Sequence, residues 1–487
     1  MGFTVAKISI DIQTPQGPAR LSLELPGELE WQVQTVPEPP DIDPPDPNPE
    51  PEPDLEGFFV APAGEAGTEG TTDAPWSLHY ALSGADGRVV PGTTLYLRGG
   101  TYPGHYKSQL TGTQEARITV RAYPGEQPRI DCGQDNPESN SALEVLGSWT
   151  DYIGLELTDS RTSRTDTGAP STPDGILPLS GAADNRFIYC LMHDLSGQAI
   201  GSYLGDYSGD YYGNVCWYNG LNSLDHNIYT QNEGKYKTYI GNVIAFAANH
   251  GFHAYGSENS RLDKFLVTDN VSIENGLLRE SAARNFLVGG GDIAEGLVFT
   301  GNHGFYSVND GTCADLGYIY GLGTSSAHVL NNHFIGGFVT LNMPGHENCH
   351  FTGNELYPAT ADRLQNFDPA EFPENTYHES RPTGLHTYVI PIDRFQPGRA
   401  LIVVYNWDEE SECEVDLAGL LEEGAPFEVR STEDFLGSPV LPETEYDGSP
   451  LRLPLAAGSV QAPTYANHTK PNSTLPVFGC FVVVPKE

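Results

Sequence analysis

The chain has 487 residues with 54 glycines, 38 prolines and only 3 methionines, and its 65 acidic and 25 basic side chains give a formal charge of −40. A field of this sign repels DNA, RNA and anionic membranes, so neither nucleic acid nor a membrane surface is an expected partner. Short apolar runs bounded by glycine and proline, with few long helical patterns, predict an all-β protein.

The first 56 residues divide into a β-rich segment and a spacer. Alternation of apolar and polar residues predicts two or three strands within residues 1–36, too few to be stable alone. Residues 37–56 are rich in Pro, Glu and Asp, which predicts an extended polyproline spacer. We interpret residues 1–36 as an attachment module on a stiff tether, with a passive linker as the alternative. No signal peptide is visible, so either a native leader was removed or the protein leaves its cell by another route, for example on a virus particle; we expect an extracellular or virion-associated protein.

Residues 57–382 carry a regular repeat. The motif [Gly/Asp/Asn]-Asn-x recurs at intervals of 28, 28, 32, 30 and 22 residues, with its asparagine at Asn214, Asn242, Asn270, Asn302, Asn332 and Asn354. Such a period is typical of architectures with one coil per repeat. Asparagine tolerates a left-handed φ and can bond its equivalents one coil above and below. The repeat therefore predicts a β-solenoid with an asparagine ladder at one corner.

The entry to this region carries a family resemblance. Four segments carry it: GFFVAP at 57–62, WSLHYAL at 76–82, PGTTLYLRGGTY at 91–102 and ITVRAYPG at 118–125. Together they resemble the cap and first coils of the pectate-lyase-like superfamily, and the resemblance extends over about residues 57–360. It implies a right-handed parallel β-helix whose open end is covered by a short capping helix. The superfamily contains lyases, hydrolases, epimerases and non-catalytic fibres, so the resemblance implies the fold and leaves the reaction open.

Residues 383–487 show a different pattern. Apolar runs about ten residues apart, separated by turn signals, predict a small C-terminal β-sandwich with strands at residues 387–391, 400–407, 412–417, 427–430, 451–455 and 478–484. The seven cysteines are scattered along the chain without C-x-x-C spacing. This spacing excludes the usual zinc patterns and a dense disulfide framework, and we expect small apolar fillers instead.

The asparagine repeat also predicts a row of outward side chains. It brings four strands into register: residues 200–203, 228–231, 252–255 and 286–289. Because side chains alternate along a strand and parallel strands lie about 4.8 Å apart, Tyr229 is expected outside the solenoid beside His253. Gln231 is likewise expected beside Tyr255.

This row is a candidate sugar-binding surface. Tyr203 extends it by one coil, and Tyr318 and Tyr320 extend it in the other direction. Aromatic faces stack on the apolar side of pyranose rings, and polar tips bind hydroxyls. The alternative is a packing role, because outward aromatic ladders also stabilise β-helices. Further candidate substrate-binding residues flank the row: Asn232, Glu258 and Asn285.

Two reactions are compatible with the residues around the row. In β-elimination, His253 or Tyr229 removes the proton α to a uronate carboxylate, Arg284 stabilises the enolate and His226 is the second proton carrier. Glycoside hydrolysis requires two carboxylates. Asp225 is the first candidate, paired with Glu258 or Asp174. The paired-aspartate motifs of the superfamily's hydrolases are absent from the sequence, which disfavours hydrolysis. The acidic surface, with few Arg or Lys near the row, disfavours elimination on a polyuronate. Of the two reactions, elimination is slightly preferred.

We therefore expect a carbohydrate-directed β-helix that cleaves a polysaccharide. The alternative is a non-catalytic virion or cell-surface protein that binds glycans, either as a homotrimer or attached to a larger assembly through residues 1–36. No metal ligand is assigned because the sequence has no compact D-x-[DN]-x-[DN]-G loop. The acidic surface nevertheless leaves Ca²⁺ as a candidate cofactor.

Overall fold

Two compact units make up the protein, Met1–Leu55 and Glu56–Glu487. The computed structural model describes residues 6–14, 17–25, 55–133, 141–164, 173–203, 206–257, 261–278, 283–308, 311–343 and 348–486. In the first unit, β1 (Ala6–Thr14) and β2 (Gly17–Leu25) form an antiparallel hairpin. The predicted N-terminal segment thus contains two strands, and residues 37–54 of the predicted spacer lie outside the described residues.

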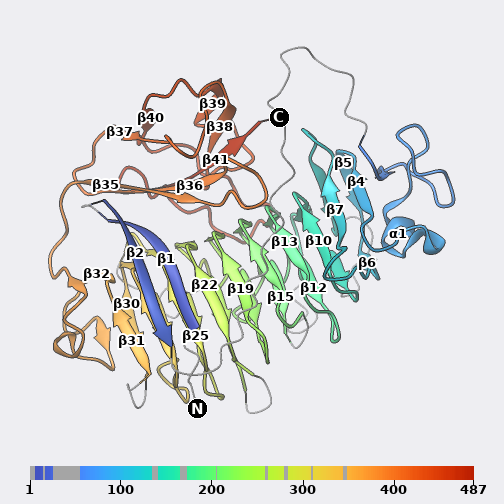
Figure 1. Ribbon diagram of the computed structural model, residues 1–487. Helices are drawn as coiled ribbons and strands as arrows, with labels where there is room; N and C mark the ends of the chain where they lie inside the picture. Colours follow the sequence, from blue (N-terminus) through green and yellow to red (C-terminus); the bar gives the residue numbers. More distant parts are fainter. Residues whose placement is uncertain are drawn as a thin grey trace. The chain divides into compact units, whose positions relative to one another are not determined.

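The second unit is built around a right-handed parallel β-helix with three sheets (Figure 1). Sheet 1 contains β3 (Phe58–Val60), β4 (Thr94–Leu97), β7 (Ile118–Ala122), β10 (Thr150–Ile153), β13 (Arg186–Ile188), β16 (Asp210–Tyr212), β19 (Lys237–Ile240), β22 (Phe265–Thr268), β25 (Leu297–Thr300), β28 (Ala327–Leu330) and β31 (Cys349–Thr352). Sheet 2 contains β5 (Gly100–Pro103), β8 (Pro128–Asp131), β11 (Glu156–Thr158), β14 (Leu191–His193), β17 (Val215–Trp217), β20 (Val243–Ala245), β23 (Val271–Ile273), β26 (His303–Phe305), β29 (His333–Ile335), β32 (Glu355–Tyr357) and β34 (Thr376–Tyr377). Sheet 3 contains β6 (Tyr106–Ser108), β9 (Leu143–Val145), β12 (Ile176–Pro178), β15 (Ile200–Ser202), β18 (Ile228–Thr230), β21 (Phe252–Ala254), β24 (Arg284–Val288), β27 (Thr312–Leu316), β30 (Phe338–Leu341) and β33 (Leu364–Gln365). The predicted fold class is confirmed.

Helices are few and short. The five-residue helix α1 (Leu78–Leu82) buries Leu78, Ala81 and Leu82 against the core of the first coils, so it is the predicted cap. Two 3₁₀ turns, η1 (Ala85–Gly87) and η2 (Pro369–Glu371), complete the helical elements of the described residues. None of these helices is long and apolar enough to cross a membrane.

The predicted asparagine ladder is present at the corner before the strands of sheet 2. Asn270 Oδ1 accepts the backbone N–H of Asn242 at 2.9 Å and its Nδ2 at 2.8 Å. The same pair of bonds joins every neighbouring pair in the row, which extends one coil further to Asn375. The ladder asparagines do not adopt the left-handed φ for which asparagine is suited. The residue before each of them has that backbone conformation, as at Asp269 with φ 59°. The asparagine instead satisfies the backbone donor that the turn leaves buried.

The interior of the solenoid is closely packed by stacked side chains. Tyr152, Phe187, Tyr211 and Tyr239 form a row of nearly parallel rings with successive centroid distances of 5.2, 5.2 and 4.6 Å. All seven cysteines are buried and unpaired with one another. They therefore fill space in the core, as the sequence predicts.

The C-terminal region forms two packed antiparallel sheets. The larger has the order β35 (Leu385–Pro391), β36 (Ala400–Asn406), β41 (Phe478–Pro485), β38 (Pro426–Ser431) and β39 (Leu441–Glu445). The smaller pairs β37 (Glu412–Val415) with β40 (Leu451–Pro454), and residues of both sheets share one hydrophobic cluster. Of these strands, only β39 was not expected from the sequence.

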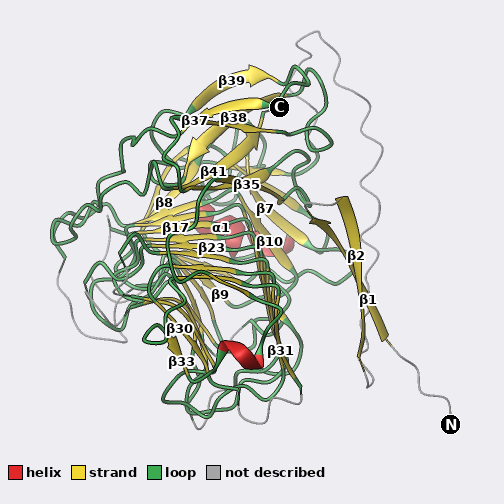
Figure 2. Ribbon diagram, turned by 90° about the vertical axis from the view of Figure 1, so that its left-hand side faces the viewer, coloured by secondary structure: helices red, strands yellow, loops and turns green. Residues whose placement is uncertain are grey.

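The C-terminal sheets cover the outer face of sheet 2 (Figures 1 and 2). Phe305 of β26 stacks on Phe478 of β41 with ring centroids 4.3 Å apart. The hydroxyl of Tyr189 donates to the carbonyl of Ile392 at 2.6 Å. Sheet 2 is thus largely occupied by contacts within the chain, whereas the predicted row of outward side chains belongs to sheet 3.

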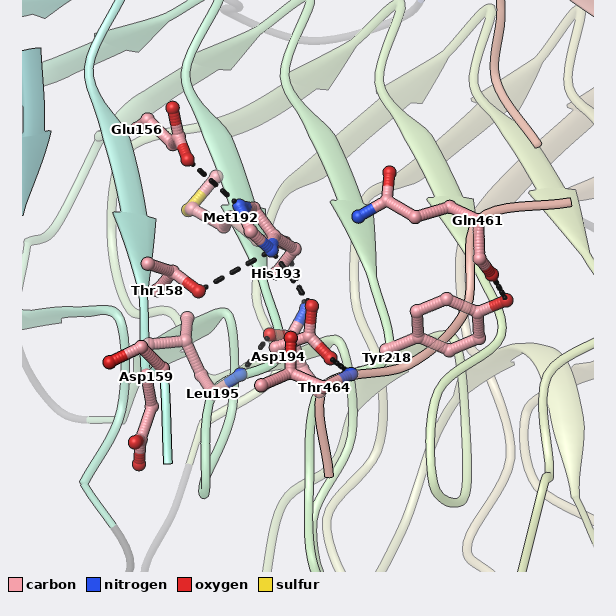
Figure 3. A network of polar contacts seen from close by, with 12 residues as sticks. Glu156, Thr158, Asp159, Met192, His193, Asp194, Leu195, Tyr218, Gln461 and Thr464 are labelled. Carbon is pink, nitrogen blue, oxygen red and sulfur yellow. Dashed lines mark hydrogen bonds and ion pairs between the residues drawn. The ribbon is translucent and has the colours of Figure 1, made fainter. Parts of the chain in front are cut away.

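A buried ionic network lies beneath this C-terminal cover (Figure 3). His193 Nδ1 is 2.9 Å from Asp194 Oδ2, and its Nε2 is 3.2 Å from Glu156 Oε1. The imidazole stacks on Trp217 at 4.5 Å, and the backbone N–H of Thr464 donates to Asp194 Oδ1 at 2.6 Å. Burial alone would lower the pKa of His193, but the hydrogen bonds to the two carboxylates outweigh it and raise that pKa. We interpret this network as structural, because it holds the C-terminal region on the β-helix.

Candidate functional site

The outward row on sheet 3 has the predicted register. Tyr229 of β18 pairs with His253 of β21, and their ring centroids are 5.2 Å apart and perpendicular. Ile228, Phe252 and Ala254 belong to the interior core. Because side chains alternate along a strand, Tyr229 and His253 must face the exterior. The predicted position of both side chains is confirmed.

The row is one continuous chain of rings. We call it the aromatic belt, and it comprises Tyr203, Tyr229, His253, Tyr255, Tyr318 and Tyr320. Successive centroids in the belt lie 5.2 to 5.7 Å apart. Exposure is highest at the ends, with Tyr203 36% and Tyr320 80% exposed, and falls to 8% at His253 near the centre. The belt therefore offers stacking surface at its ends and a sheltered polar centre.

Gln231 ties the middle of the belt together. Its Nε2 donates to the hydroxyl of Tyr229 at 3.2 Å and to the carbonyl of Tyr255 at 3.1 Å. The Tyr229 hydroxyl in turn donates to that carbonyl at 3.3 Å. Gln231 thus lies beside Tyr255, as predicted, and these three hydrogen bonds orient the Tyr229 phenol.

A second row of polar side chains runs beside the belt, two positions before an inward core residue in each of five successive strands of sheet 3, β12, β15, β18, β21 and β24. We call it the polar ladder, and it comprises Asp174, Gln198, His226, His250 and Arg284. In each step the backbone N–H of one residue donates to the side chain of the previous one: Gln198 to Asp174 at 2.8 Å, His226 to Gln198, His250 to His226 Nδ1 at 3.3 Å and Arg284 to His250 Nδ1 at 3.1 Å. Sequence reasoning assigned no role to Gln198 or His250. Their constant offset from Ile200 and Phe252 is the signal that could have found them.

The ladder fixes the tautomers of two histidines. His226 and His250 lie parallel with centroids 4.8 Å apart, and each accepts a backbone N–H on Nδ1. A neutral imidazole carries one N–H, so the proton of each ring must be on Nε2. His253 is perpendicular to both rings, at 4.3 and 4.7 Å. Two N–H donors therefore stand beside the ring of His253.

These three histidines are also the group best placed to hold a metal among the described residues. Calcium prefers oxygen ligands, so three imidazoles do not suit it. A transition metal needs an unprotonated ring nitrogen from each histidine. Binding through Nε2 would move a proton to Nδ1, and binding through Nδ1 would displace the backbone donor, so either choice breaks the ladder bonds of His226 and His250. The hydrogen bonding does not fit a metal centre, and we assign none here.

The electrostatics of the belt's centre favour a neutral His253. Burial lowers the pKa of His253 well below its ordinary value, and His226, His250 and Arg284 lower it further. Its Nδ1 is buried and has no hydrogen-bond partner among the described residues. Burial raises the pKa of Tyr229, so that phenol keeps its proton. A neutral imidazole base and a protonated phenol are thus in contact.

Arg284 has a compensated charge. Its Nε is 2.8 Å from Asp315 Oδ2, and its guanidinium lies 5.5 Å from the ring centre of Tyr318. Burial raises the pKa of Asp315, and Arg284 partly offsets that rise. The predicted cation is therefore beside the belt but shares its charge with a carboxylate.

The structure does not bring every predicted site residue to the belt. Asp225 is fully buried, and its Oδ2 accepts the backbone N–H groups of Leu221 and Asn222 at 2.9 and 3.0 Å. Asn232 donates to the carbonyl of Lys235 in its own turn at 2.6 Å and to the carbonyl of Asp263 on the next coil at 2.7 Å.

Asn285 lies in a second, interior asparagine row, where its Oδ1 accepts Nδ2 of Asn275 at 2.9 Å. Glu258 lies outside the described residues. Asp225, Asn232 and Asn285 have backbone or core roles that explain their positions, and we leave them out of the proposed binding surface.

Comparison with known proteins gives a family match over the coils that carry Tyr203, Tyr229, His253 and Tyr255, whereas Tyr318 and Tyr320 lie beyond it. Residues 58–292 match the family described as the Pel9A-like, right handed beta helix region. A pectate lyase PEL9 of Emericella nidulans is 38% identical over 106 residues, which is 21% of this chain and 25% of that protein, so the match spans about a quarter of the curated relative. Among solved structures, pectate lyase Pel9A aligns with a TM-score of 0.43 at 18% identity, covering 61% of this chain and 78% of that one. The alginate lyase from Paenibacillus sp. str. FPU-7 aligns with a TM-score of 0.42 at 17% identity, covering 61% and 96%.

Proposed function

We propose that this protein, whose β-helix belongs to the pectate-lyase-like superfamily, binds an acidic polysaccharide along sheet 3 and cleaves it by β-elimination. The observation that carries the proposal is the buried, neutral His253, which contacts a protonated Tyr229 and two histidines with fixed N–H donors. The family match supports it, because the matched residues include every coil from β15 to β24.

Binding uses the aromatic belt. Sugar rings stack on the exposed faces of Tyr203 and Tyr320, and the glycan between them crosses the coils in front of Tyr229 and His253. The sheltered centre excludes water from the reacting sugar, which strengthens each hydrogen bond made there.

The reaction divides among three kinds of group. His253 removes the proton α to the uronate carboxylate, and the electron pair of that C–H bond forms the new C=C bond. The Nε2–H groups of His226 and His250 donate to the carboxylate as it becomes an enolate, with Arg284 behind them. Tyr229 protonates the glycosidic oxygen as its bond to carbon breaks. The products are an unsaturated sugar end and a free hydroxyl.

Hydrolysis has weaker support from the same surface. It requires one carboxyl group as acid and another as nucleophile or base, on either side of the glycosidic bond. Asp225 is fully buried and accepts two backbone N–H groups through a single oxygen. It is therefore poorly placed to serve as either group.

The proposal is tested by incubating the protein with a panel of acidic and neutral polysaccharides. Elimination gives ultraviolet absorbance from the unsaturated product, whereas hydrolysis gives new reducing ends without it. We expect absorbance from at least one uronate-containing polymer, its loss in His253→Ala, and its retention in His350→Ala, which removes an exposed histidine from sheet 1. No product by either readout would refute the lyase proposal.

A non-catalytic glycan-binding role is the second candidate. The observation that favours it is the separate N-terminal unit with its β1–β2 hairpin, which suits attachment to a virion or cell surface. This role predicts a defined oligomer of the full chain by light scattering and glycan binding without any product. A monomer that releases unsaturated sugars would contradict it.

A further inference from the structure

The outward residues that end the strands of sheet 3 form a column whose character changes along the solenoid. Each follows an inward residue of its strand, and the later members donate their backbone N–H to the coil before them. The column comprises Tyr203, Gln231, Tyr255, Gly289, Gly317 and Asn342. Side chains that face the ligand thus give way to two glycines, and beyond Tyr255 the belt continues through Tyr318 and Tyr320.

The two glycines leave room for a turn, which we call the tyrosine turn and which comprises residues 317–321. A Cβ at Gly289 would lie only 2.7 Å from the Cβ of Tyr318. A Cβ at Gly317 would collide with the backbone carbonyl of Asn342. Glycine is therefore required at both positions if the turn is to lie against the coils on either side of it.

The backbone of the tyrosine turn is supported by a side chain from the next coil. Tyr318 has a φ of 54°, a left-handed conformation that a bulky residue rarely adopts and that the surroundings must hold in place. The Nδ2 of Asn342 donates to the carbonyls of Tyr318, Gly321 and Gly317 at 3.0, 3.2 and 3.4 Å. An amide group has two N–H donors, so the three carbonyls share them. One side chain therefore fixes both ends of the turn.

The turn presents the most exposed ring of the aromatic belt. The ring of Tyr318 is nearly perpendicular to those of Tyr255 and Tyr320, with centroids 5.7 Å apart in both pairs, and Tyr320 is 80% exposed. A ring on a loose turn would have to be ordered when a sugar stacks on it, and that ordering weakens binding. A turn that is fixed in advance avoids this loss.

We infer that Asn342 is a positioning residue for glycan binding, which holds the tyrosine turn so that Tyr318 and Tyr320 form a sugar-stacking platform. This inference rests on the proposed binding along sheet 3 and needs no particular reaction. The three bonds from one amide to the turn carry it. Because the contact of His253 with Tyr229 lies outside the turn, a change at Asn342 should alter KM and leave kcat nearly unchanged.

Two uncharged variants of the full chain test the role of the amide. Asn342→Ala removes it, and Asn342→Leu removes it while keeping a side chain of similar volume. We expect both to raise KM on a cleaved acidic polysaccharide about three- to tenfold, the cost of ordering a side chain on binding, with kcat within about twofold of the parent. Hydrogen exchange should become faster in peptides that contain residues 317–321. Asn472→Ala, at an exposed position of the C-terminal region, should change none of these values.

A double-mutant cycle separates positioning from a general loss of stability. If Asn342 acts through the turn, Asn342→Ala and Tyr320→Ala together should raise KM by less than the product of their separate effects. Effects that multiply, an unchanged KM or unchanged hydrogen exchange in Asn342→Ala would overturn the inference and leave the lyase proposal standing.

Binding gives a readout that does not need cleavage. Affinity electrophoresis in gels that contain the polysaccharide compares the parent with Asn342→Ala. A parent that binds a glycan without cleaving it would refute the lyase proposal, and weaker binding by Asn342→Ala would then still uphold the inference. Equal binding by the two proteins would overturn the inference, and a parent that binds no glycan would overturn both proposals.

Discussion

Replacing Asn270 by alanine removes five hydrogen bonds from the asparagine ladder. Its Oδ1 accepts the backbone N–H and Nδ2 of Asn242, and its Nδ2 donates to Tyr239 O, Thr268 O and Asn302 Oδ1 at 2.8 to 3.0 Å. The substitution leaves at least the backbone N–H and one side-chain N–H of Asn242 without a partner in a fully buried corner. Each lost partner costs about 1–3 kcal/mol, so we expect the free energy of unfolding to fall by about 2–6 kcal/mol.

Urea unfolding followed by tryptophan fluorescence and circular dichroism measures this loss. The matched control is Asn472→Ala, an exposed asparagine of the C-terminal region, for which we expect a change within about 0.5 kcal/mol. Long repeat arrays can unfold in more than one step, so the comparison uses the transition that contains the β-helix. A loss below about 1 kcal/mol for Asn270→Ala would refute the reasoning, because the ladder would then contribute no more than a surface contact.

Three further predictions concern the histidines. His253→Ala should lower kcat/KM about 10²–10⁴-fold while circular dichroism stays unchanged, since a positioned proton acceptor contributes that much; a smaller loss would remove His253 as the base. The pKa of His253 is lowered, and the neutral ring is the active form. We therefore expect kcat/KM of the parent protein to stay high as the pH falls through 6.5, the ordinary histidine value, and to drop only well below it. A half-maximum of kcat/KM at or above pH 6.5 would contradict the assignment of His253 as the base. The raised pKa of His193 stabilises the fold below the unfolded value of 6.5, and this contribution is lost as pH rises through the folded pKa. The difference in unfolding free energy between the parent and His193→Gln should therefore shrink from acidic to alkaline pH, and a constant difference would argue against the buried ionic network.

The parts of the fold that follow a repeat could be predicted from the sequence. The asparagine spacing sets the coil length, and a parallel strand fixes the register of its neighbour, so the contact of Tyr229 with His253 followed from the alignment of two coils. The strand β39 was missed because its sequence, Leu441–Glu445, is largely polar and exposed and has no apolar alternation. The docking of the C-terminal sheets on sheet 2 depends on contacts far apart in the sequence, and no local pattern encodes it.

The candidate site was predicted in outline, and its hydrogen bonding was not. Asp174, Gln198, His226 and His250 differ in charge and size, and they share only a side-chain acceptor that the next backbone N–H can use. A pattern of residue types does not reveal such a row. Its members share only their position, two residues before the inward core residue of the same strand, and an alignment of the coils on those core residues would reveal it. Asn285 was assigned to the surface together with Arg284, but it lies at the corner before the core residue Phe286, as Asn227 lies before Ile228, and its side chain bonds Asn275 and the Phe305 carbonyl there.

A crystal structure with a bound acidic oligosaccharide tests the central claim most directly. Our account predicts sugar rings along the aromatic belt, with a uronate carboxylate within hydrogen-bond distance of Nε2 of His226 and His250, and the glycosidic oxygen beside Tyr229. A glycan bound to sheet 1 or to the C-terminal sheets, with the belt on sheet 3 left empty, would contradict it.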